Sequence, residues 1–223
     1  PDTVHAAVLA RIDLLSRQER GILQAAAVVS RAFRTELLEA VMDQYSGAEI
    51  AEALDGLLAR DMLVQIEHDR YNFRHILIRD VAYGTLSRGE RIRLHSKIAL
   101  WLEASSREHL DEYVEIIAYH YREAIQFSRQ SAIPLPLPFK TEDTVPLFAR
   151  AGILAGHTGS YIEAKNHMQM AIDLAPETAR MQLYEQLGDS VLWGEIPNEA
   201  YRKALDCWRA GAEKDPLTGA RLM

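Results

Sequence analysis

The stretch "YNFRHILIRDVAYGTLSRGERIRLH", residues 71–95, changes from a strand pattern to a helix pattern and decides the fold of the first half of the chain. Tyr71 and Phe73 alternate with polar neighbours, as residues of a half-buried strand do. The residues after His75 are spaced as in two successive helices. Just upstream, "MLVQIEHDR" (62–70) predicts a first strand and a turn. We therefore expect a β-hairpin followed by helices that begin near His75.

Three helix starts around this hairpin are marked by a serine followed three residues later by a glutamate. In such a capping box the serine side chain accepts from the first helical turn and the glutamate reaches back to the serine N–H. The pairs are Ser16/Glu19, Ser46/Glu49 and Ser87/Glu90. Apolar residues after the second and third pairs repeat with the 3.6-residue period of a helix. Residues 1–104 are thus predicted as three helices, a hairpin and two more helices, which is the layout of a winged helix.

The second half of the chain has the spacing of tetratricopeptide repeats, in which paired antiparallel helices approach closely at small residues. The segment "FARAGILAGHTGSYIEAKNHMQMAIDLAP" (148–176) carries small and large residues at the repeat positions. These are Phe148, Ala151, Gly152, Ala155, Gly159, Tyr161, Ala164, Met168, Ala171 and Pro176. A weaker second copy places Gly188 and Ala200 at the same positions, each 36 residues after Gly152 and Ala164.

A proline-rich stretch separates the two halves. "SAIPLPLPFKTEDTVP" (131–146) contains four prolines, which fix φ and lack an N–H, so we expect a loop at about 128–143. Residues 111–125 before it are predicted to be an earlier helix of the repeat stack. The expected fold is all-α with a small β-hairpin wing: a winged-helix domain with flanking helices over 1–104, then tetratricopeptide-like helices over 105–223. More repeats are expected after Met223.

The amino-acid composition indicates an ordinary globular protein without disulfides or a zinc site. The chain has 223 residues, 48% hydrophobic residues, 26% charged residues and a net charge of −7. Cys207 is the only cysteine, which excludes an internal disulfide, and no Cys/His cluster has zinc spacing. The first residues are amphipathic and unlike a signal peptide, and no apolar run is long enough to span a membrane. We expect a cytoplasmic protein, and the initial proline suggests a piece of a longer chain.

Charge argues against the DNA contact that a winged helix would suggest. The helix in the recognition position, "SGAEIAEALDGLLARDM" (46–62), carries Glu49, Glu52, Asp55 and Asp61 against one arginine. Residues 1–104 hold 13 Lys and Arg against 15 Asp and Glu, so there is no surplus of cations to neutralise phosphates. We therefore expect this domain to pack against another protein domain. The alternative is a transcriptional regulator whose winged helix binds DNA.

Residues with catalytic or metal-binding side chains are scattered along the sequence. The sequence contains no phosphate-binding glycine loop and no nucleophile motif, so we expect no catalytic residues and no metal site. Adjacent carboxylates such as Asp111 and Glu112 are expected to be solvated surface. The basic residues Arg88, Arg91 and His95 share one helix face, which is either solvated or contacts an acidic patch of another domain. Three tryptophans at apolar helical positions are expected in the core: Trp101, Trp193 and Trp208.

Two segments, "PDTVHAAVLARIDLLSRQERGILQAAAVVSRAF" (1–33) and "YNFRHILIRDVAYGTLSRGERIRLHSKIALWLE" (71–103), resemble a region of bacterial STAND-type signalling ATPases. The region follows the nucleotide-binding domain, in regulators similar to the maltose activator and in proteins where the ATPase follows an adenylate or guanylate cyclase domain. The resemblance implies that a winged helix closes an ATPase domain located before Pro1 and that tetratricopeptide repeats follow. ATP or ADP would then be a cofactor of that preceding domain, and none is expected in this segment.

His75 is the residue whose role the resemblance changes most. "RHILIRDVA" (74–82) is similar to the methionine–histidine–aspartate motif of plant resistance and apoptotic ATPases, whose histidine contacts the β-phosphate of ADP in the closed state. Arg74 stands in the place of the methionine and Ile76 in the place of the aspartate. The alternative is that His75 only starts its helix and donates to a nearby carbonyl. The implied function is a non-catalytic regulatory and protein-interaction module, with a peptide or protein partner in the repeat groove and the ATPase domain as the partner within the chain.

Overall fold

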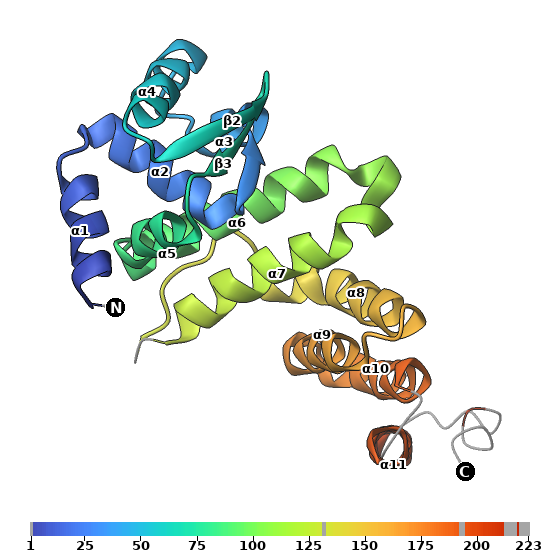
Figure 1. The fold of residues 1–223 in the computed structure, drawn as a ribbon. Coiled ribbons are helices and arrows are strands. Elements are labelled where there is room, and N and C mark those ends of the chain that lie inside the picture. The colour runs from blue at the N-terminus through green and yellow to red at the C-terminus, as the bar shows by residue number, and fades with distance from the viewer. Residues whose placement is uncertain (1, 131–132, 192–194, 212–217, 219–223) are drawn as a thin grey trace. The chain divides into compact units, whose positions relative to one another are not determined.

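The structure, a computed structural model, describes residues 2–130, 133–191, 195–211 and 218. It is mostly helical with one small antiparallel sheet, in agreement with the predicted all-α fold with a small hairpin (Figure 1). The chain divides into two compact units. Unit 1 comprises residues 1–105 and 123–137, and unit 2 comprises residues 106–122 and 138–223. The first segment of unit 1 ends one residue after the predicted boundary at 104, whereas 123–137 was predicted with the repeats.

Unit 1 contains the elements from α1 through α6 and, after the first part of unit 2, the last turns of α7 (Leu110–Arg129). The elements are α1 (Asp2–Asp13), α2 (Arg17–Val29), β1 (Ala32–Arg34), α3 (Thr35–Val41), α4 (Gly47–Ala59), β2 (Leu63–Glu67), β3 (Arg70–Phe73), α5 (Ile76–Gly84) and α6 (Arg88–Ser105). The strand order is β1-β3-β2, with both pairings antiparallel. The predicted hairpin is therefore confirmed, but the prediction missed β1 and one of the four helices that precede the hairpin.

All three predicted capping boxes are present. Ser16 and Ser46 each accept from the backbone of the third helical residue and receive its glutamate on their own N–H. At the start of α6 the Ser87 N–H donates to the Glu90 carboxylate at 2.8 Å, and the Glu90 N–H donates to the Ser87 hydroxyl at 3.3 Å. These local contacts satisfy N–H groups that the first turn of a helix leaves without partners, so they fix where α2, α4 and α6 begin.

The core of unit 1 is built around α2. This helix packs against α3, α4, α5, α6 and β1. Its second half is a run of small and branched apolar side chains that are almost fully buried: Ile22, Leu23, Ala25, Ala26, Ala27, Val28 and Val29. Alanines allow neighbouring helices to come close on several sides, and burial of the larger side chains supplies the hydrophobic free energy.

One carboxylate is buried where α2 meets α4. Glu19 is 8% exposed, accepts from the Ser16 N–H and lies 3.3 Å from the Arg60 guanidinium. Gly56 of α4 makes room for it, since a Cβ at that position would stand 2.3 Å from the Glu19 Oε1 atom. The capping box of α2 therefore also serves as a tertiary contact, because its glutamate is paired and hydrogen-bonded at the helix–helix junction.

Unit 2 consists of the first part of α7 followed by two helix hairpins. Its remaining elements are η1 (Arg107–His109), η2 (Thr141–Thr144), α8 (Val145–His157), α9 (Tyr161–Leu174), α10 (Glu177–Ser190) and α11 (Ile196–Ala210). Helix α8 packs against α9, α10 packs against α11, and α10 also contacts both α8 and α9. The predicted loop at 128–143 is shorter in the structure, because α7 continues to Arg129 and a 3₁₀ helix begins at Thr141.

The small residues of the repeat pattern lie where helices of unit 2 approach one another. A Cβ on Gly152 would stand 2.7 Å from Met168 Cγ and 3.2 Å from the Ala164 carbonyl oxygen of α9. A Cβ on Gly188 would stand 2.7 Å from the ring of Tyr201 in α11. Phe148, Ala164, Ala171 and Ala200 are buried, Tyr161 is half-buried, and Gly159 occupies the α8–α9 turn with φ of +80°.

The tryptophan prediction is wrong where the structure describes these residues. Trp101 and Trp208 are only half-buried, because each lies at the edge of its helix's apolar face, and Trp193 lies outside the described residues. Cys207, next to Trp208, is also half-buried, and this burial raises the pKa of its thiol.

We predict that Gly152→Leu destabilises unit 2, because the new side chain must displace Met168 and the backbone of α9. Overpacking of a filled contact costs about 1–3 kcal/mol in the free energy of unfolding. Gly89→Leu in α6 is the matched control, since no atom lies within 4 Å of a Cβ there. Chemical denaturation of both variants measures the difference. Equal unfolding midpoints for the two variants would show that α8 and α9 do not meet at Gly152.

Candidate functional site

His75 lies at the junction between β3 and α5, in the N-cap position of the helix. Its backbone is extended, with φ of −137° and ψ of 143°, and its side chain makes no capping hydrogen bond. The imidazole is exposed. His75 therefore begins the helix through its backbone, while its ring remains accessible to a group outside unit 1.

Arg74, the residue before it, is held in place from two directions. Its N–H donates to the Met62 carbonyl at 3.0 Å, and its guanidinium lies 3.5 Å from the Asp61 carboxylate. Asp61 has a φ of 52°, in the left-handed region that a non-glycine residue seldom adopts. Both candidate nucleotide-sensing residues are exposed, but they differ in their partners: Arg74 is paired with Asp61 just after α4, whereas the His75 side chain makes no capping hydrogen bond.

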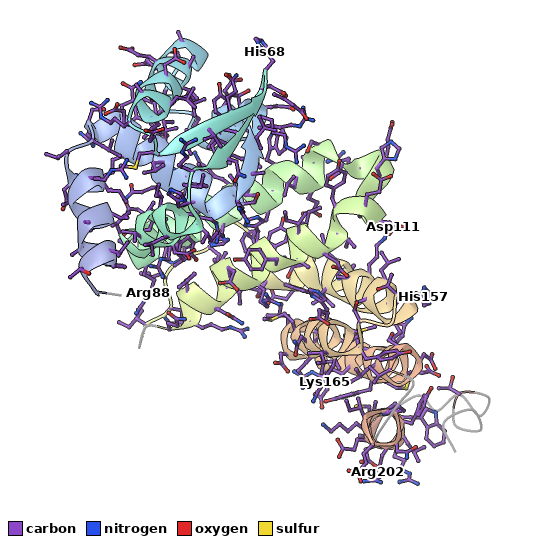
Figure 2. The ribbon with its side chains drawn as sticks, in the orientation of Figure 1. His68, Arg88, Asp111, His157, Lys165 and Arg202 are labelled. Atoms are coloured by element: carbon purple, nitrogen blue, oxygen red, sulfur yellow. The ribbon has the colours of Figure 1, made fainter. Side chains whose placement is uncertain are left out.

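The proposed contact face Arg88, Arg91 and His95 is not a single exposed surface. Arg88 is exposed at the start of α6 (Figure 2). Arg91 is half-buried: it lies 4.5 Å from the centre of the Tyr83 ring and 5.2 Å from that of Phe127, and it donates to the Tyr83 carbonyl at 3.1 Å. His95 is fully buried. The prediction of a shared outward face is therefore wrong for His95, and Arg91 is largely used within unit 1.

Burial gives His95 unusual acid–base behaviour. Its Nε2 atom lies 3.1 Å from the Tyr83 hydroxyl, and its ring packs against Tyr83 and Phe127. Desolvation, followed by the positive charges of Arg91 and Arg79, lowers the pKa of His95 to about 4. His95 is therefore neutral in the folded protein at neutral pH, which suits a structural role in the core and not a contact to an acidic patch.

The exposed face of α4 is acidic, as the sequence predicts. Glu49, Glu52 and Asp55 are exposed on this helix, and Arg60 at its end is engaged with Glu19. The hairpin carries His68 at its tip, with Glu67 close by (Figure 2). Neither surface presents a surplus of cations, and such a surplus is what gives proteins their affinity for nucleic-acid phosphates.

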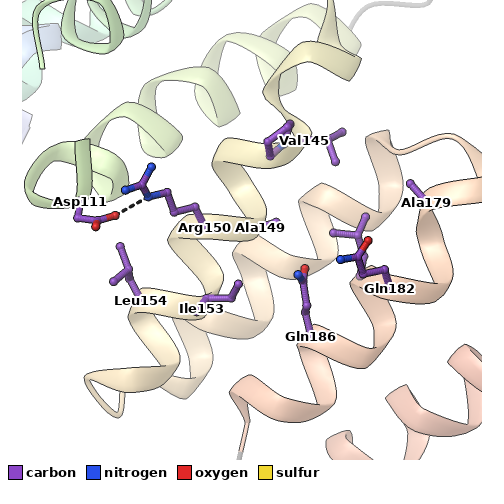
Figure 3. Close-up of a pocket in the computed structure, with 11 residues that line it drawn as sticks. Asp111, Val145, Ala149, Arg150, Ile153, Leu154, Ala179, Gln182 and Gln186 are labelled. Carbon is purple, nitrogen blue, oxygen red and sulfur yellow. Dashed lines mark hydrogen bonds and ion pairs between the residues drawn. The ribbon is translucent and has the colours of Figure 1, made fainter. Parts of the chain in front are cut away.

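Unit 2 carries a groove of about 540 Å³ that could hold a partner (Figure 3). It is formed by side chains from the start of α7, from α8 and from α10. The floor is apolar, and two glutamines from successive turns of α10 line one side. The lining residues are Asp111, Val145, Pro146, Ala149, Arg150, Ile153, Leu154, Ala179, Gln182, Leu183 and Gln186.

An ion pair closes one side of this groove. The Arg150 Nε–H donates to the Asp111 carboxylate, with both side chains about half exposed. This hydrogen bond lowers the pKa of Asp111 and raises that of Arg150, so the pair stays charged across the physiological range. The sequence predicted Asp111 only as solvated surface, because its partner lies on another helix, 39 residues further along the chain.

Two classes of site are not found in the part of the chain that the structure describes. Within it, no group of three or more His, Cys, Asp or Glu side chains is placed to hold a metal ion. None of the described helices has both the length and the apolar character needed to cross a bilayer.

Comparisons with known proteins find one relative. The chain is 25% identical over 181 residues to an uncharacterized protein of Rhizobium meliloti (strain 1021). The match covers 75% of this chain but only 15% of that protein, so the chain spans a small part of its relative's length. No family model and no solved structure matches the chain.

We predict that protonation of His95 destabilises unit 1 in mild acid. Its pKa is lower in the folded state than the ordinary 6.5, so its contribution is complete above pH 6.5 and is lost as the pH falls from 6.5 toward 4. The loss amounts to about 3 kcal/mol at most. Denaturant titrations between pH 7 and pH 4 should show a smaller loss for His95→Gln than for the wild type.

The matched control is His68→Gln, which removes an exposed histidine from the hairpin tip. Its pH profile should follow the wild type. If His95→Gln loses as much unfolding free energy over this pH range as the wild type does, the imidazole is not the group responsible.

Proposed function

We propose that this chain is a non-catalytic regulatory and protein-interaction segment of a larger nucleotide-switch signalling protein. The order of elements supports a winged helix in unit 1: a helix, a short strand, two helices and a hairpin, in a sheet ordered β1-β3-β2. The two hairpins of unit 2, with glycines at their close approaches, support a tetratricopeptide-like stack. The match to a small part of a much longer protein is consistent with a segment that works alongside other domains.

The observation that carries the interaction function is the groove on α8 and α10. Stacked helix pairs place successive first helices side by side, and the face between them becomes a continuous binding surface. In unit 2 this face combines an apolar floor with polar groups at its edges, which is the usual composition of a ligand-binding cleft. Its volume of about 540 Å³ suits a few side chains of a peptide segment.

The charges in the groove indicate what kind of peptide it binds. Among the described residues that line the groove, Arg150 is the only cation, and it is already paired with Asp111, so an acidic ligand gains little from it. Gln182 and Gln186 offer neutral donors and acceptors along one side of the groove. The proposed occupant is therefore a neutral apolar segment of a partner protein whose polar backbone groups pair with the glutamines.

Unit 1 is proposed to contact protein as well, through the preceding nucleotide-binding domain. The acidic face of α4 does not favour the alternative of a DNA-binding regulator, because Glu49, Glu52 and Asp55 would meet phosphates directly. His75, exposed at the N-cap of α5, is the side chain available for a nucleotide held by that domain. An imidazole donates to a phosphate without a permanent charge, so such a contact is readily released when the switch opens.

We predict that Ile153→Asp weakens peptide binding to the groove. The probe is a fluorescent peptide selected from a random display library on the wild-type chain, and the measurement is fluorescence anisotropy. Loss of one buried isoleucine contact costs about 1.5–3 kcal/mol, so affinity should fall roughly 10- to 100-fold. Ile162→Asp is the matched control, because Ile162 is 73% exposed on α9 and does not line the groove. Selected peptides that bind both variants equally would place the interaction elsewhere.

A second prediction concerns His75 in the full-length parent protein. Replacing His75 with alanine removes a hydrogen-bond donor to a charged oxygen, an interaction that contributes about 1.5–3 kcal/mol. Release of bound ADP should then accelerate roughly 10- to 100-fold, while the isolated 223-residue chain keeps its melting temperature. His68→Ala serves as the control for loss of an exposed histidine. ADP release at the wild-type rate from His75→Ala would leave His75 with only its helix-start role.

A further inference from the structure

Unit 1 contains a second cleft, of about 440 Å³, whose lining is polar and rich in arginine. Arg17 and Arg20 reach it from the first turn of α2, and Arg93 reaches it from α6. Tyr45 contributes from the connection between α3 and α4, and Glu90 from the first turn of α6. Three guanidinium groups and one carboxylate therefore face one small volume.

The charges around this cleft are not all compensated. Arg20 lies 3.3 Å from the Asp13 carboxylate and donates to the Asp13 carbonyl at 2.9 Å, so its charge is matched. Glu90 accepts from Ser87 as the cap of α6. In contrast, the side chains of Arg17 and Arg93 make no hydrogen bond or ion pair with any other residue that the structure describes. Arg17 thus lines the cleft without a close counter-charge. The charge of Arg93 is only partly offset by Glu90, whose pKa is lowered by hydrogen bonds from Ser87 and, to a smaller extent, by Arg93.

Nearby acidic residues are already engaged with other groups. Asp43 lies 2.6 Å from the Lys97 ammonium, which also donates to the Val41 carbonyl. The hydrogen bond from Lys97, with a smaller contribution from Arg93, lowers the pKa of Asp43. Because Asp43 is paired with Lys97, it offsets only part of the charge that Arg93 presents to the cleft.

Some of the remaining polar groups of the cleft already have hydrogen-bond partners, and others are available to a ligand. Gln24 donates to the Thr85 hydroxyl at 2.9 Å, and the Thr85 hydroxyl in turn donates to the Ala82 carbonyl at 2.6 Å. The Tyr45 hydroxyl packs over Gly21, where a Cβ would be 3.7 Å away, and it has no hydrogen-bond partner among the described residues. The groups left available are therefore two guanidiniums and a phenol, all of which can donate.

The N-terminus of α2 does not itself contribute to this set. Its capping box is complete, since Ser16 accepts from the Glu19 N–H and the Glu19 carboxylate accepts from the Ser16 N–H. Binding at the cleft would rest on side chains from three separate elements of unit 1, and not on the dipole or backbone of one helix.

We propose that this cleft binds a phosphate monoester, with Arg17 and Arg93 holding its oxygens and the Tyr45 hydroxyl donating a third hydrogen bond. A dianion with three terminal oxygens matches two guanidiniums and one hydroxyl, and the planar fork of arginine suits phosphate oxygens. A carboxylate carries one charge and would leave a guanidinium unmatched. The site is independent of the peptide groove proposed above, because all its lining residues belong to unit 1.

Isothermal titration calorimetry on the 223-residue chain at low salt tests the proposal, with glycerol 3-phosphate and a phosphoserine peptide as probes. Arg17→Gln and Arg93→Gln should each weaken binding roughly tenfold or more, the effect of losing a hydrogen bond to a charged group. Tyr45→Phe should weaken it less, by a few-fold. Arg31→Gln is the matched control, since Arg31 is an exposed arginine of unit 1 that does not line the cleft. Both arginines of the site are exposed, so the melting temperatures of all variants should stay near the wild type.

The results of this titration distinguish the two possible sources of the phosphate group and show whether the proposal fails. If the two probes bind with equal affinity, a small phosphate monoester is enough for binding. If the phosphoserine peptide binds more tightly than both its unphosphorylated form and glycerol 3-phosphate, the ligand is a phosphorylated side chain. The proposal is overturned if neither probe binds the wild type, if acetate at the same concentration competes as well as phosphate does, or if Arg31→Gln weakens binding as much as the cleft variants do.

Discussion

Close packing of neighbouring helices at glycine positions is the constraint on which the rest of this structure depends. In unit 2, α8 and α9 meet at Gly152, and the end of α8 meets α10 at Gly156, where a Cβ would stand 2.5 Å from the Ser190 carbonyl oxygen. In unit 1, the buried Glu19 fits only because Gly56 has no side chain. At each contact the glycine lowers the stability of its helix by about 1 kcal/mol, and this loss is offset by dense packing between elements. The groove on α8 and α10 exists because these helices are held side by side in this way.

Features fixed by local contacts could be predicted from the sequence. The three capping boxes join residues three positions apart, so their serines and glutamates mark helix starts whatever surrounds them. The hairpin is also local, since β2 and β3 are separated by two residues. The strand β1 was missed because it has only three residues and acquires its strand conformation by pairing Phe33 with Tyr71, far along the chain. No short-range pattern marks such a strand.

The candidate contact face on α6 shows a second limit of sequence patterns. Arg88, Arg91 and His95 do share one side of a helix, as their spacing predicts. The spacing cannot tell which sides of α6 are covered. Phe127, from the end of α7, packs against His95 and Arg91, and this segment was expected to belong to the repeats. The covering residue lies 32 positions after His95, so a face that is basic in sequence is partly interior in the structure. The sequence predicts a groove on the repeats but not the residues that line it, and the arginine cleft was not predicted at all, since each site gathers side chains from separate elements.

The two candidate binding sites differ most in how their arginines are partnered, and this difference predicts different ligands. Removing an ion from water is costly unless it gains a counter-charge. Arg150 has such a counter-charge in Asp111, so a peptide can cover the groove without burying an unpaired cation. For the same reason acidic side chains would bind there only weakly. Arg17 and Arg93 form no ion pair with a described residue, although Glu90 and Asp43 partly offset the charge of Arg93, and a neutral ligand that covered both arginines would bear much of their desolvation cost. Only an anion turns that cost into a favourable contact. The same residue type therefore selects a neutral segment in unit 2 and a phosphate in unit 1, and the arrangement of carboxylates around each arginine decides which.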